Sequence, residues 1–480
     1  MPALTLVVAA LTILVQTVLI VICNLPAVRR TGTALRDDET PGHASAPVLS
    51  IHIAARNEPP AVLIATLESL RRQTDAPEHE VIVMINNTPC AELWQPVERW
   101  CHKAGRQFRL VRRDRVTGAK AGALNIALRQ TRPTASHVVV LDADYQVVPG
   151  FLSVIAAELR RTGADFVQFP QAYRHLSPRT QGLSFELAEY FNRHARAANR
   201  ADAMLLTGTL SVIRRDALAT VGGWPSQSCT EDAELGTKLI AAGYRGVFID
   251  RVVGRGLMPL DLRNLHGQRQ RWAAGNARVL AGALRGWLGP GRDAGAGPLQ
   301  RMLVVAQLAA WLNLGAVAVV TLLAAVVQAG FGRATGLGTA IPDTTILLSF
   351  ATMGLILGAT AWPILRAMLP EVPVSVRMQA LASRLSMLPI SACATIEGLQ
   401  SKRQAFRVTA KVQPTAHAAQ ITSILSVTAT LGLALVLVAV LSTDPVVAAA
   451  GLLLLLPPAG AWAIRKPLSR YAADVSEREG

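Results

Sequence analysis

Residues 137–150 read HVVVLDADYQVVPG, and this stretch carries the strongest local signal in the chain. The apolar run at 138–141 is typical of a strand that is covered on both faces of a sheet. Asp142 and Asp144 follow directly, one residue apart. Two carboxylates at a strand end can hold a hard divalent cation that also takes diphosphate oxygens, or they can be two solvated acids in a loop. The stretch therefore predicts a buried strand whose carboxyl end carries either a cation site or two solvated acids.

The flanking sequence repeats a pattern of strand and then helix. Three apolar runs of strand length each precede a longer helical pattern; the pairs are 48–54 with 61–73, 80–85 with 91–105, and 137–141 with 150–162. This alternation predicts an α/β domain with a mostly parallel sheet and helices on both faces. Ligands bind such sheets at the carboxyl ends of the strands, so we expect the chemistry just after these runs.

Long apolar segments outside this region predict a membrane protein. Residues 3–23 are uncharged and long enough to cross about 30 Å of hydrocarbon. Arginines follow at once, so the positive-inside rule places the N-terminus outside and the following region in the cytoplasm. Four further spans are predicted, at 302–329, 344–365, 421–442 and 446–464.

Residues 374–399 are apolar enough to suggest a sixth span, but Arg377, Arg384, Pro389 and Glu397 interrupt them. An amphipathic helix lying in the inner interface fits this pattern better. A sixth span would also place the basic C-terminal tail outside, against the positive-inside rule. We therefore expect about five spans and one interfacial helix.

These boundaries give a domain plan of five parts. Residues 1–28 form an N-terminal transmembrane helix, and 29–298 form the cytoplasmic α/β domain. Residues 299–369 hold transmembrane helices two and three, and 370–420 form a cytoplasmic segment with the interfacial helix. Residues 421–480 hold helices four and five and a short cytoplasmic tail.

Composition narrows the partners. The chain of 480 residues is 51% hydrophobic, and 48 Lys and Arg against 32 Asp and Glu give a net charge of +16. Such an excess suits an anionic membrane leaflet or an anionic substrate. The basic residues are scattered, without a stripe interleaved with aromatics, so nucleic acid is not expected. The five cysteines show no C-x-x-C pair, which indicates reduced thiols.

A second acidic motif reads SCTEDAELGTKL at 228–239. Glu231 and Asp232 open a predicted helix, for which Thr230 is a natural N-cap residue. Acids at this end of a helix are favoured by its dipole, and that alone could explain them. Alternatively, Asp232 is a general base, which requires its carboxylate near an acceptor hydroxyl.

Two basic motifs follow. In QRQRW at 268–272, an Arg can donate charge-assisted hydrogen bonds to a diphosphate and a Trp can stack against a sugar ring. The alternative is a basic interfacial helix with a Trp anchor. FRVTAK at 406–411 lies in the predicted cytoplasmic segment, where a positively charged loop would be ordinary.

The order of these motifs resembles the cellulose-synthase-like branch of the family-2 glycosyltransferases. D-x-D, T-E-D, Q-x-x-R-W and F-x-V-T-x-K occur in that order, and the resemblance covers residues 48–411. Further matches are ARNEPP at 55–60, GAKAGALN at 118–125 and GTLSVIRRDAL at 208–218. The stretch NNTPCAELWQPVERWC is most similar to the bacterial membrane β-glucan synthase-like members.

The resemblance implies a GT-A fold and a role for each motif. Asp142 and Asp144 would bind Mg²⁺ or Mn²⁺ and the nucleotide diphosphate, and Asp232, beside Glu231, would be the catalytic base. The other implied residues belong to three groups: donor or nucleotide binding by Asn57, Glu58, Asn87, Lys120 and Asn125; acceptor and diphosphate contacts by Gln268, Arg271 and Trp272; and a gating loop of Phe406, Val408, Thr409 and Lys411.

Two positions depart from the family pattern. Ile85 stands where relatives usually have an Asp that contacts the nucleotide base, with Asn86 and Asn87 as neighbouring hydrogen-bonding groups. Arg56 stands where relatives often have Tyr, and it could pair with a phosphate. Both positions bear on nucleotide specificity.

The resemblance implies an inverting glycosyltransferase of a bacterial inner membrane, multi-pass, with its catalytic domain in the cytoplasm. It would use a nucleotide sugar, with UDP-glucose suggested by the resemblance, to elongate and export a β-linked polysaccharide. Two alternatives stay open: transfer of a single sugar to a lipid or other acceptor, and a non-catalytic component of an export complex. The expected partners are a UDP-sugar donor, a growing polysaccharide or other glycan acceptor, the lipid bilayer and export partner proteins.

Overall fold

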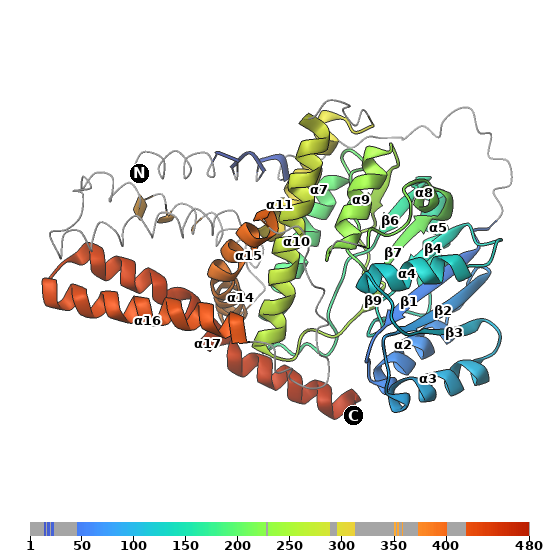
Figure 1. Ribbon diagram of the computed structural model, residues 1–480, viewed down its shortest axis with the longest axis horizontal. Helices are drawn as coiled ribbons and strands as arrows, with labels where there is room; N and C mark the ends of the chain where they lie inside the picture. Colours follow the sequence, from blue (N-terminus) through green and yellow to red (C-terminus); the bar gives the residue numbers. More distant parts are fainter. Residues whose placement is uncertain are drawn as a thin grey trace.

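The computed structural model describes residues 46–226, 229–288, 295–312, 373–400 and 419–479, with single residues and short runs between 14 and 23 and between 350 and 358. An α/β domain lies at one end of the molecule, two helices stand against it, and a long hairpin of helices projects from the other end (Figure 1).

A seven-stranded sheet forms the centre of the α/β domain, in the order β3-β2-β1-β4-β7-β6-β8. Its strands are β1 (Leu49–Ala55), β2 (His79–Asn86), β3 (Phe108–Arg113), β4 (His137–Val140), β6 (Phe166–Gln168), β7 (Ser211–Arg214) and β8 (Gly246–Phe248). Only β7 runs antiparallel to its neighbours within this sheet. A separate ribbon pairs β5 (Gln146–Val147) with β9 (Gly254–Arg255). The predicted mostly parallel sheet is confirmed.

Strand β4 shows why its apolar run is unbroken. Val139 belongs to one hydrophobic core, and Val138 and Val140 belong to another on the opposite face. Successive side chains of a strand point to opposite faces, so a strand covered on both faces needs apolar residues throughout.

Helices of the α/β domain cover both faces of the sheet. They are α2 (Pro60–Arg71), α3 (Ala91–Ala104), α4 (Ala119–Gln130), α5 (Phe151–Thr162), α8 (Arg215–Thr220) and α9 (Glu231–Ala241). Helices α2, α3 and α5 contribute to the first core, and α4 and α9 contribute to the second. Between β6 and β7 lie short helical segments, η1 (Gln181–Ser184), α6 (Phe185–Glu189), η2 (Tyr190–Ala195, a π-helix) and α7 (Arg196–Ala198).

The three strand and helix pairs expected from the sequence are confirmed within two residues at each end. Strand β3 and helix α4 are additional. Strand β3 reads FRLVRR and lies at the edge of the sheet, where it is only partly covered. Because an edge strand tolerates charge, it lacks the apolar run by which buried strands are recognised.

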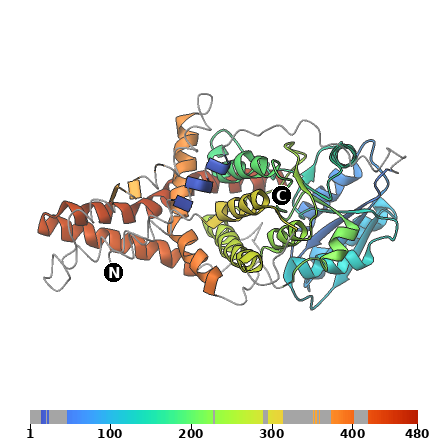
Figure 2. The same cartoon turned by 90° about the horizontal axis from the view of Figure 1, so that it is seen from above.

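The remaining helices connect this domain to the projecting hairpin. They are α10 (Leu262–Leu288), α11 (Pro298–Leu312), α14 (Val374–Ser386), α15 (Leu388–Gln400), α16 (Ala419–Ser442) and α17 (Pro445–Glu479). Helices α16 and α17 lie side by side along the hairpin (Figures 1 and 2).

Within the described residues, two helices are long and apolar enough to cross a membrane, at Ile424–Ser442 and Pro445–Glu479. They correspond to the fourth and fifth predicted spans. The hairpin exposes large apolar side chains such as Leu433, Val440 and Leu441, as a lipid-facing surface would. The first and third predicted spans lie mainly outside the described residues, so the structure does not support a count of five.

Two predicted segments differ from the structure in detail. The predicted second span began at 302, but α11 packs against the α/β domain, with the Gln307 side chain bonded to Leu205 N and Ala203 O at 2.9 and 2.8 Å. The expected short tail after residue 464 is the continuation of α17, which is helical to Glu479.

The predicted interfacial helix at 374–399 is two helices, α14 and α15, that meet at Met387. The break between the two helices lies next to Pro389, because a proline cannot donate the backbone hydrogen bond that would continue the first helix. Ser386 on α14 bonds to the buried His266 of α10 at 3.0 Å, which fixes the pair against the rest of the molecule.

Candidate functional site

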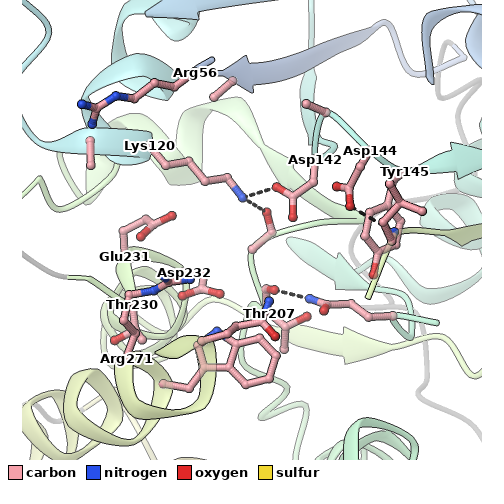
Figure 3. A pocket seen from close by; sticks show the side chains of 18 of the residues that line it. Arg56, Lys120, Asp142, Asp144, Tyr145, Thr207, Thr230, Glu231, Asp232 and Arg271 are labelled. Carbon is pink, nitrogen blue, oxygen red and sulfur yellow. Dashed lines mark hydrogen bonds and ion pairs between the residues drawn. The ribbon is translucent and has the colours of Figure 1, made fainter. Parts of the chain in front are cut away.

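A cavity of about 210 Å³ opens at the carboxyl end of β4, where sequence analysis placed the chemistry. Four carboxylates line it, from Asp142, Asp144, Glu231 and Asp232, and Lys120 lies among them (Figure 3). The D-x-D motif, the T-E-D motif and the Q-x-x-R-W motif are therefore brought to one site from positions far apart in the chain.

The backbone of the D-x-D motif is held from both sides. The Asp142 N–H donates to Thr209 Oγ1 at 2.9 Å. The Asp144 carboxylate is almost fully buried, and its Oδ2 accepts a hydrogen bond from the Leu257 N–H at 3.0 Å. The Arg174 guanidinium donates to the Asp144 carbonyl oxygen. These bonds aim both acidic side chains at the cavity.

Lys120, near the start of α4, connects the motifs electrostatically. Its Nζ lies 2.5 Å from Asp142 Oδ1 and 2.6 Å from the Gly208 carbonyl oxygen. Burial by itself would lower the pKa of Lys120, but the carboxylates of Asp142, Glu231 and Asp232 outweigh it and raise the pKa. The amine therefore stays protonated and offsets part of the negative charge in the cavity.

Glu231 and Asp232 open helix α9, as predicted, with Thr230 at the N-cap position. Thr230 makes no side-chain capping bond there, whereas Asp232 Oδ1 accepts a hydrogen bond from the Ala233 N–H in the first turn at 2.9 Å. Burial, with a contribution from Asp232, raises the pKa of Glu231 to about 7. Burial also raises the pKa of Asp232. Each of the two neighbouring carboxyls therefore has a pKa above its usual value, and the protonation of one affects the other.

Two glycines allow the motifs to approach this closely. Gly208 has φ +87°, and a Cβ added there would lie 2.9 Å from Asp232 Oδ2. A Cβ added to Gly275 of α10 would lie 2.5 Å from the Thr230 side chain. Larger residues at either position would push the T-E-D motif out of place.

Helix α10 carries the Q-x-x-R-W motif, and Gln268, Arg271 and Trp272 all line the cavity, as predicted. Trp272 packs edge-on against Trp311 of α11, with ring centroids 4.6 Å apart. The Arg269 guanidinium lies over the Trp272 ring, 4.2 Å from its centre. The indole is thus fixed by its neighbours before any ligand arrives.

A second, smaller cavity of about 40 Å³ adjoins the first. The two cavities share Asp232, Trp272, Gln171, Thr207 and Thr230 as lining residues. The further walls of the small cavity combine aromatic and amide side chains with aliphatic ones, namely Tyr190, Phe191, Trp311, Asn276 and Gln307 with Leu187, Leu205, Leu206 and Ala233. Aromatic faces with a few amides are typical of a surface that binds a sugar ring.

The residues at the D-x-D motif fit a Mg²⁺ or Mn²⁺ ion. Asp142 and Asp144 supply hard oxygen donors to one cavity, and hard cations prefer such ligands. Among the described residues, no group of three or more His, Cys, Asp or Glu side chains could enclose a metal ion. Two carboxylates would instead leave positions for phosphate oxygens and water, as sites that bind metal and diphosphate together do.

The structure brings together nine of the predicted site residues in the walls of the larger cavity: Glu58, Lys120, Asp142, Asp144, Glu231, Asp232, Gln268, Arg271 and Trp272. Asn57, Asn87 and Asn125 are not among its lining residues. The Asn87 side chain bonds to the backbone of Val116, and Asn125 bonds to that of Trp224. The predicted gating residues Phe406, Val408, Thr409 and Lys411 lie outside the described residues.

Sequence analysis did not assign several lining residues. They are Tyr145, Gln171, Tyr173, Thr207, Gly208 and Met258. Gly208 lay within the quoted GTLSVIRRDAL stretch, and Tyr145 directly follows the D-x-D motif, so both carried a local signal. Gln171, Tyr173 and Met258 have no motif around them, and only the folding of the chain brings them to the site.

Comparison with known proteins gives matches in sequence and in fold. Residues 50–222 match the model of glycosyl transferase family 2, and residues 137–365 match that of glycosyl transferase family group 2. The chain is similar in fold to a mannosyltransferase from Pyrobaculum calidifontis, solved in complex with GDP-Man and Mn²⁺. That likeness has a TM-score of 0.55 at 20% identity, and it covers 82% of this chain and 100% of the other.

Two curated relatives align with parts of the sequence. A UDP-forming cellulose synthase catalytic subunit of Dictyostelium discoideum is 33% identical over 179 residues, 35% of this chain and 17% of that protein. Glucomannan 4-beta-mannosyltransferase 7 of Arabidopsis thaliana is 26% identical over 259 residues, 52% of this chain and 46% of that protein. The chain thus matches less than half the length of either relative. Residues 50–365 of this chain thus carry glycosyl transferase family 2 domains.

Proposed function

We propose that the protein is a membrane-embedded inverting glycosyltransferase that elongates and exports a β-linked polysaccharide from a nucleotide-sugar donor. In this proposal the membrane is a bacterial inner membrane, crossed several times, and the α/β domain faces the cytoplasm. UDP-glucose is the first donor to test.

One observation carries the proposal: Asp232 lies where the two cavities meet. The larger cavity holds the D-x-D carboxylates, where a nucleoside diphosphate would bind. The smaller cavity has an aromatic lining suited to an acceptor sugar. A base that removes a proton from the acceptor must stand between donor and acceptor, and Asp232 has that place.

The residues then divide the reaction among them. The Asp232 carboxylate accepts the proton of the acceptor hydroxyl, whose oxygen forms a bond to the anomeric carbon of the donor sugar. The bond from that carbon to the diphosphate oxygen breaks on the opposite side, and the nucleoside diphosphate leaves with the electron pair. Lys120 and Arg271 donate hydrogen bonds to the departing phosphates. A divalent cation bound to Asp142 and Asp144 would neutralise further charge on the diphosphate.

The acidity of the site suits this role. A general base works best when its pKa lies near the working pH. Burial raises the pKa of Asp232, and the neighbouring Glu231 carboxyl has a pKa of about 7 for the same reason. The pair can therefore take up a proton during transfer and release it to solvent afterwards.

Elongation and export are favoured over single transfer by the helices around the acceptor cavity. Trp311, a wall of that cavity, lies near the end of α11, within the stretch 302–329 that was predicted as the second span. The apolar hairpin of α16 and α17 separately supports a membrane location for the protein. An acceptor chain leaving the cavity past Trp311 would thus enter the predicted membrane region.

The nucleobase of the sugar donor is the part of the proposal that the structure constrains least. Ile85 is buried in the core behind the cavity, whereas Asn86, Arg56 and Glu58 line it. The nucleobase of a bound donor would therefore contact the Asn86 amide and the Arg56 guanidinium. Since relatives are named both as UDP-forming synthases and as mannosyltransferases, GDP-mannose belongs in the same screen as UDP-glucose.

The test is a transfer assay on the purified full chain in lipid with Mn²⁺ or Mg²⁺, using UDP-glucose, UDP-N-acetylglucosamine and GDP-mannose. A high-molecular-weight product that is lost in Asp232→Asn would support the proposal. Small, defined products would indicate transfer of a single sugar. No nucleotide release with any donor from folded protein would overturn the enzymatic proposal and favour a non-catalytic component of an export complex.

A further inference from the structure

The last turns of helix α17 reach the D-x-D motif from behind. After the apolar hairpin, α17 runs back to the α/β domain and ends against it (Figures 1 and 2). Tyr471 on this part of the helix is completely buried, and it packs with Tyr173, Leu257 and Met258. The contact joins a helix with a membrane-compatible segment to a wall of the active cavity.

A first connection runs from Tyr471 to the Asp144 carboxylate. The Met258 N–H donates a hydrogen bond to the Tyr471 hydroxyl at 2.9 Å. The adjacent Leu257 N–H donates to Asp144 Oδ2 at 3.0 Å. Two successive backbone amides are thus fixed, one by the α17 side chain and one by the carboxylate that is predicted to bind the metal.

A second connection runs from Glu479 to the Asp144 backbone. Glu479 Oε1 lies 3.0 Å from Arg174 Nε and 2.9 Å from Arg174 Nη2, and it also lies 2.7 Å from His175 Nε2. The remaining terminal nitrogen of Arg174 donates to the Asp144 carbonyl oxygen. Glu479 therefore determines where this buried guanidinium points.

Charge makes this second connection more than a packing contact. The Arg174 side chain is only 6% exposed, and a buried guanidinium needs a paired anion. Without Glu479, we expect the Arg174 guanidinium to pair with the acidic groups of the cavity. Such a cation would compete with the metal for the Asp144 region.

The surrounding backbone is packed tightly enough to transmit a shift. The Arg174 N–H donates to the Gly256 carbonyl oxygen at 2.9 Å. A Cβ added to Gly256 would lie 2.1 Å from the ring of Tyr145, the residue after the D-x-D motif. His175, the other partner of Glu479, has a φ of +60°, which is unusual for a residue with a side chain.

We propose that Tyr471 and Glu479 are positioning residues for the D-x-D loop, and that this end of α17 sets the metal affinity of the site. The inference rests on the proposed function, because it takes Asp142 and Asp144 as the metal ligands. Residues that orient metal ligands from outside typically alter metal affinity by about 10- to 100-fold when they are changed.

The test measures Mn²⁺ binding to the full chain in lipid nanodiscs, with no sugar donor, from the electron paramagnetic resonance signal of free Mn²⁺. Titrations with and without UDP compare wild type with Glu479→Gln, Tyr471→Phe and Asp144→Asn. Glu477→Gln is the matched control, because Glu477 lies on the same turns of α17 and is exposed. Hydrogen exchange at residues 142–147 is followed in the same proteins.

We expect Glu479→Gln and Tyr471→Phe to raise the Mn²⁺ dissociation constant about tenfold, while Glu477→Gln leaves it unchanged. In an Arg174→Met background, Glu479→Gln should add no further loss, because Glu479 acts through Arg174. In the assay of transfer, the Mn²⁺ concentration for half-maximal rate should rise more than the maximal rate falls.

The outcomes separate this inference from the proposed function. If Asp144→Asn loses Mn²⁺ binding but Glu479→Gln and Tyr471→Phe bind as wild type does, the positioning role is overturned and the metal assignment stands. If Asp144→Asn binds Mn²⁺ like wild type, the metal assignment fails. Hydrogen exchange then decides the positioning role: faster exchange at 142–147 in Glu479→Gln than in Glu477→Gln supports it, and equal rates overturn it.

Discussion

The Lys120 ammonium lies 2.5 Å from Oδ1 of Asp142, and this pair joins the start of helix α4 to the end of strand β4. Burial raises the pKa of both Glu231 and Asp232, and the charge of Lys120 acts against that rise. One lysine therefore connects the predicted donor end of the cavity to the predicted base.

Replacing this lysine should change the pH dependence of transfer. In Lys120→Met, the pKa of the Glu231 and Asp232 pair should rise further, because a nearby positive charge is lost. The midpoint of the pH–rate profile should move to higher pH, and the donor KM should increase. Lys238→Met, at the exposed end of α9, is the control. An unchanged midpoint in Lys120→Met would contradict the electrostatic link.

The wild-type protein should gain activity as the pH rises through about 7, where the Glu231 carboxyl titrates. Below that range the pair holds a proton, and the base is then less able to accept another. A pH–rate profile at saturating donor and metal, measured from about two units below this pKa to about two units above it, checks this. A rate that is flat across that range would separate the pair from catalysis.

The same shift predicts a change in stability. The pKa of Glu231 is raised from 4.5 to about 7 by folding. A carboxyl of this kind costs nothing below its unfolded pKa. Its destabilisation of the folded state grows as the pH rises from 4.5 to about 7 and is complete above that range. Glu231→Gln should therefore stabilise the metal-free protein at about pH 8, by up to about 3 kcal/mol, and change little at about pH 4.5. Thermal unfolding in EDTA at both pH values measures this difference. Equal melting temperatures for the two proteins at the higher pH would show that Glu231 is not destabilised by burial.

Asp232→Asn should reduce the transfer rate by about 100- to 10,000-fold, as loss of a general base does. Mn²⁺ affinity should stay near that of wild type, since Asp232 is not one of the D-x-D carboxylates. Glu234→Gln, two residues along on the same helix and paired with Lys238, is the control and should keep its activity. An active Asp232→Asn protein would rule out this residue as the base.

Gly208→Ala should lose transfer activity because the new methyl group meets Asp232 Oδ2 at 2.9 Å. Its φ of +87° adds a backbone cost of about 1 kcal/mol. Gly243→Ala has nearly the same φ, +86°, with nothing within 4 Å of its Cβ, so it isolates the backbone cost. Rates and melting temperatures of both variants give the comparison. The steric argument would be wrong if both lost activity equally.

Trp311→Ala should weaken acceptor use while it spares the donor site. The Trp311 ring packs on Trp272 and lines only the smaller cavity. Loss of aromatic contacts of this size corresponds to roughly a threefold to tenfold higher acceptor KM. Nucleotide release without acceptor should be unchanged. Trp287→Ala, a buried tryptophan of α10 beside neither cavity, should affect stability alone.

Much of the site could be predicted because each motif is short and lies next to an element with its own signal. The D-x-D motif follows an unbroken apolar strand, and Glu231 and Asp232 open a helix. The alternation of strand and helix also predicts which strand ends lie beside Asp142, because the carboxyl ends of parallel strands meet at one edge of the sheet. The nine predicted residues that line the cavity all belong to such motifs.

The end of strand β2 shows where this reasoning fails by one residue. Asn87 was predicted to face the donor, but Asn86 lines the cavity. Asn87 has a φ of +48°, and its side chain bonds to Val116 instead. Which of two adjacent asparagines faces the ligand depends on how the chain leaves the strand, and their shared residue type does not specify that.

The α/β sheet, the apolar hairpin and the acidic motifs could be predicted from the sequence alone, because apolar periodicity and local spacing encode them over a few residues. The position of Tyr471 and Glu479 behind Asp144 depends on the tertiary fold, because most of the chain separates these residues in sequence. Contacts between such distant residues depend on the packing of α17 against the whole domain. No local pattern records that packing, because a tyrosine and a glutamate near a helix end look the same whether they face solvent or a buried arginine.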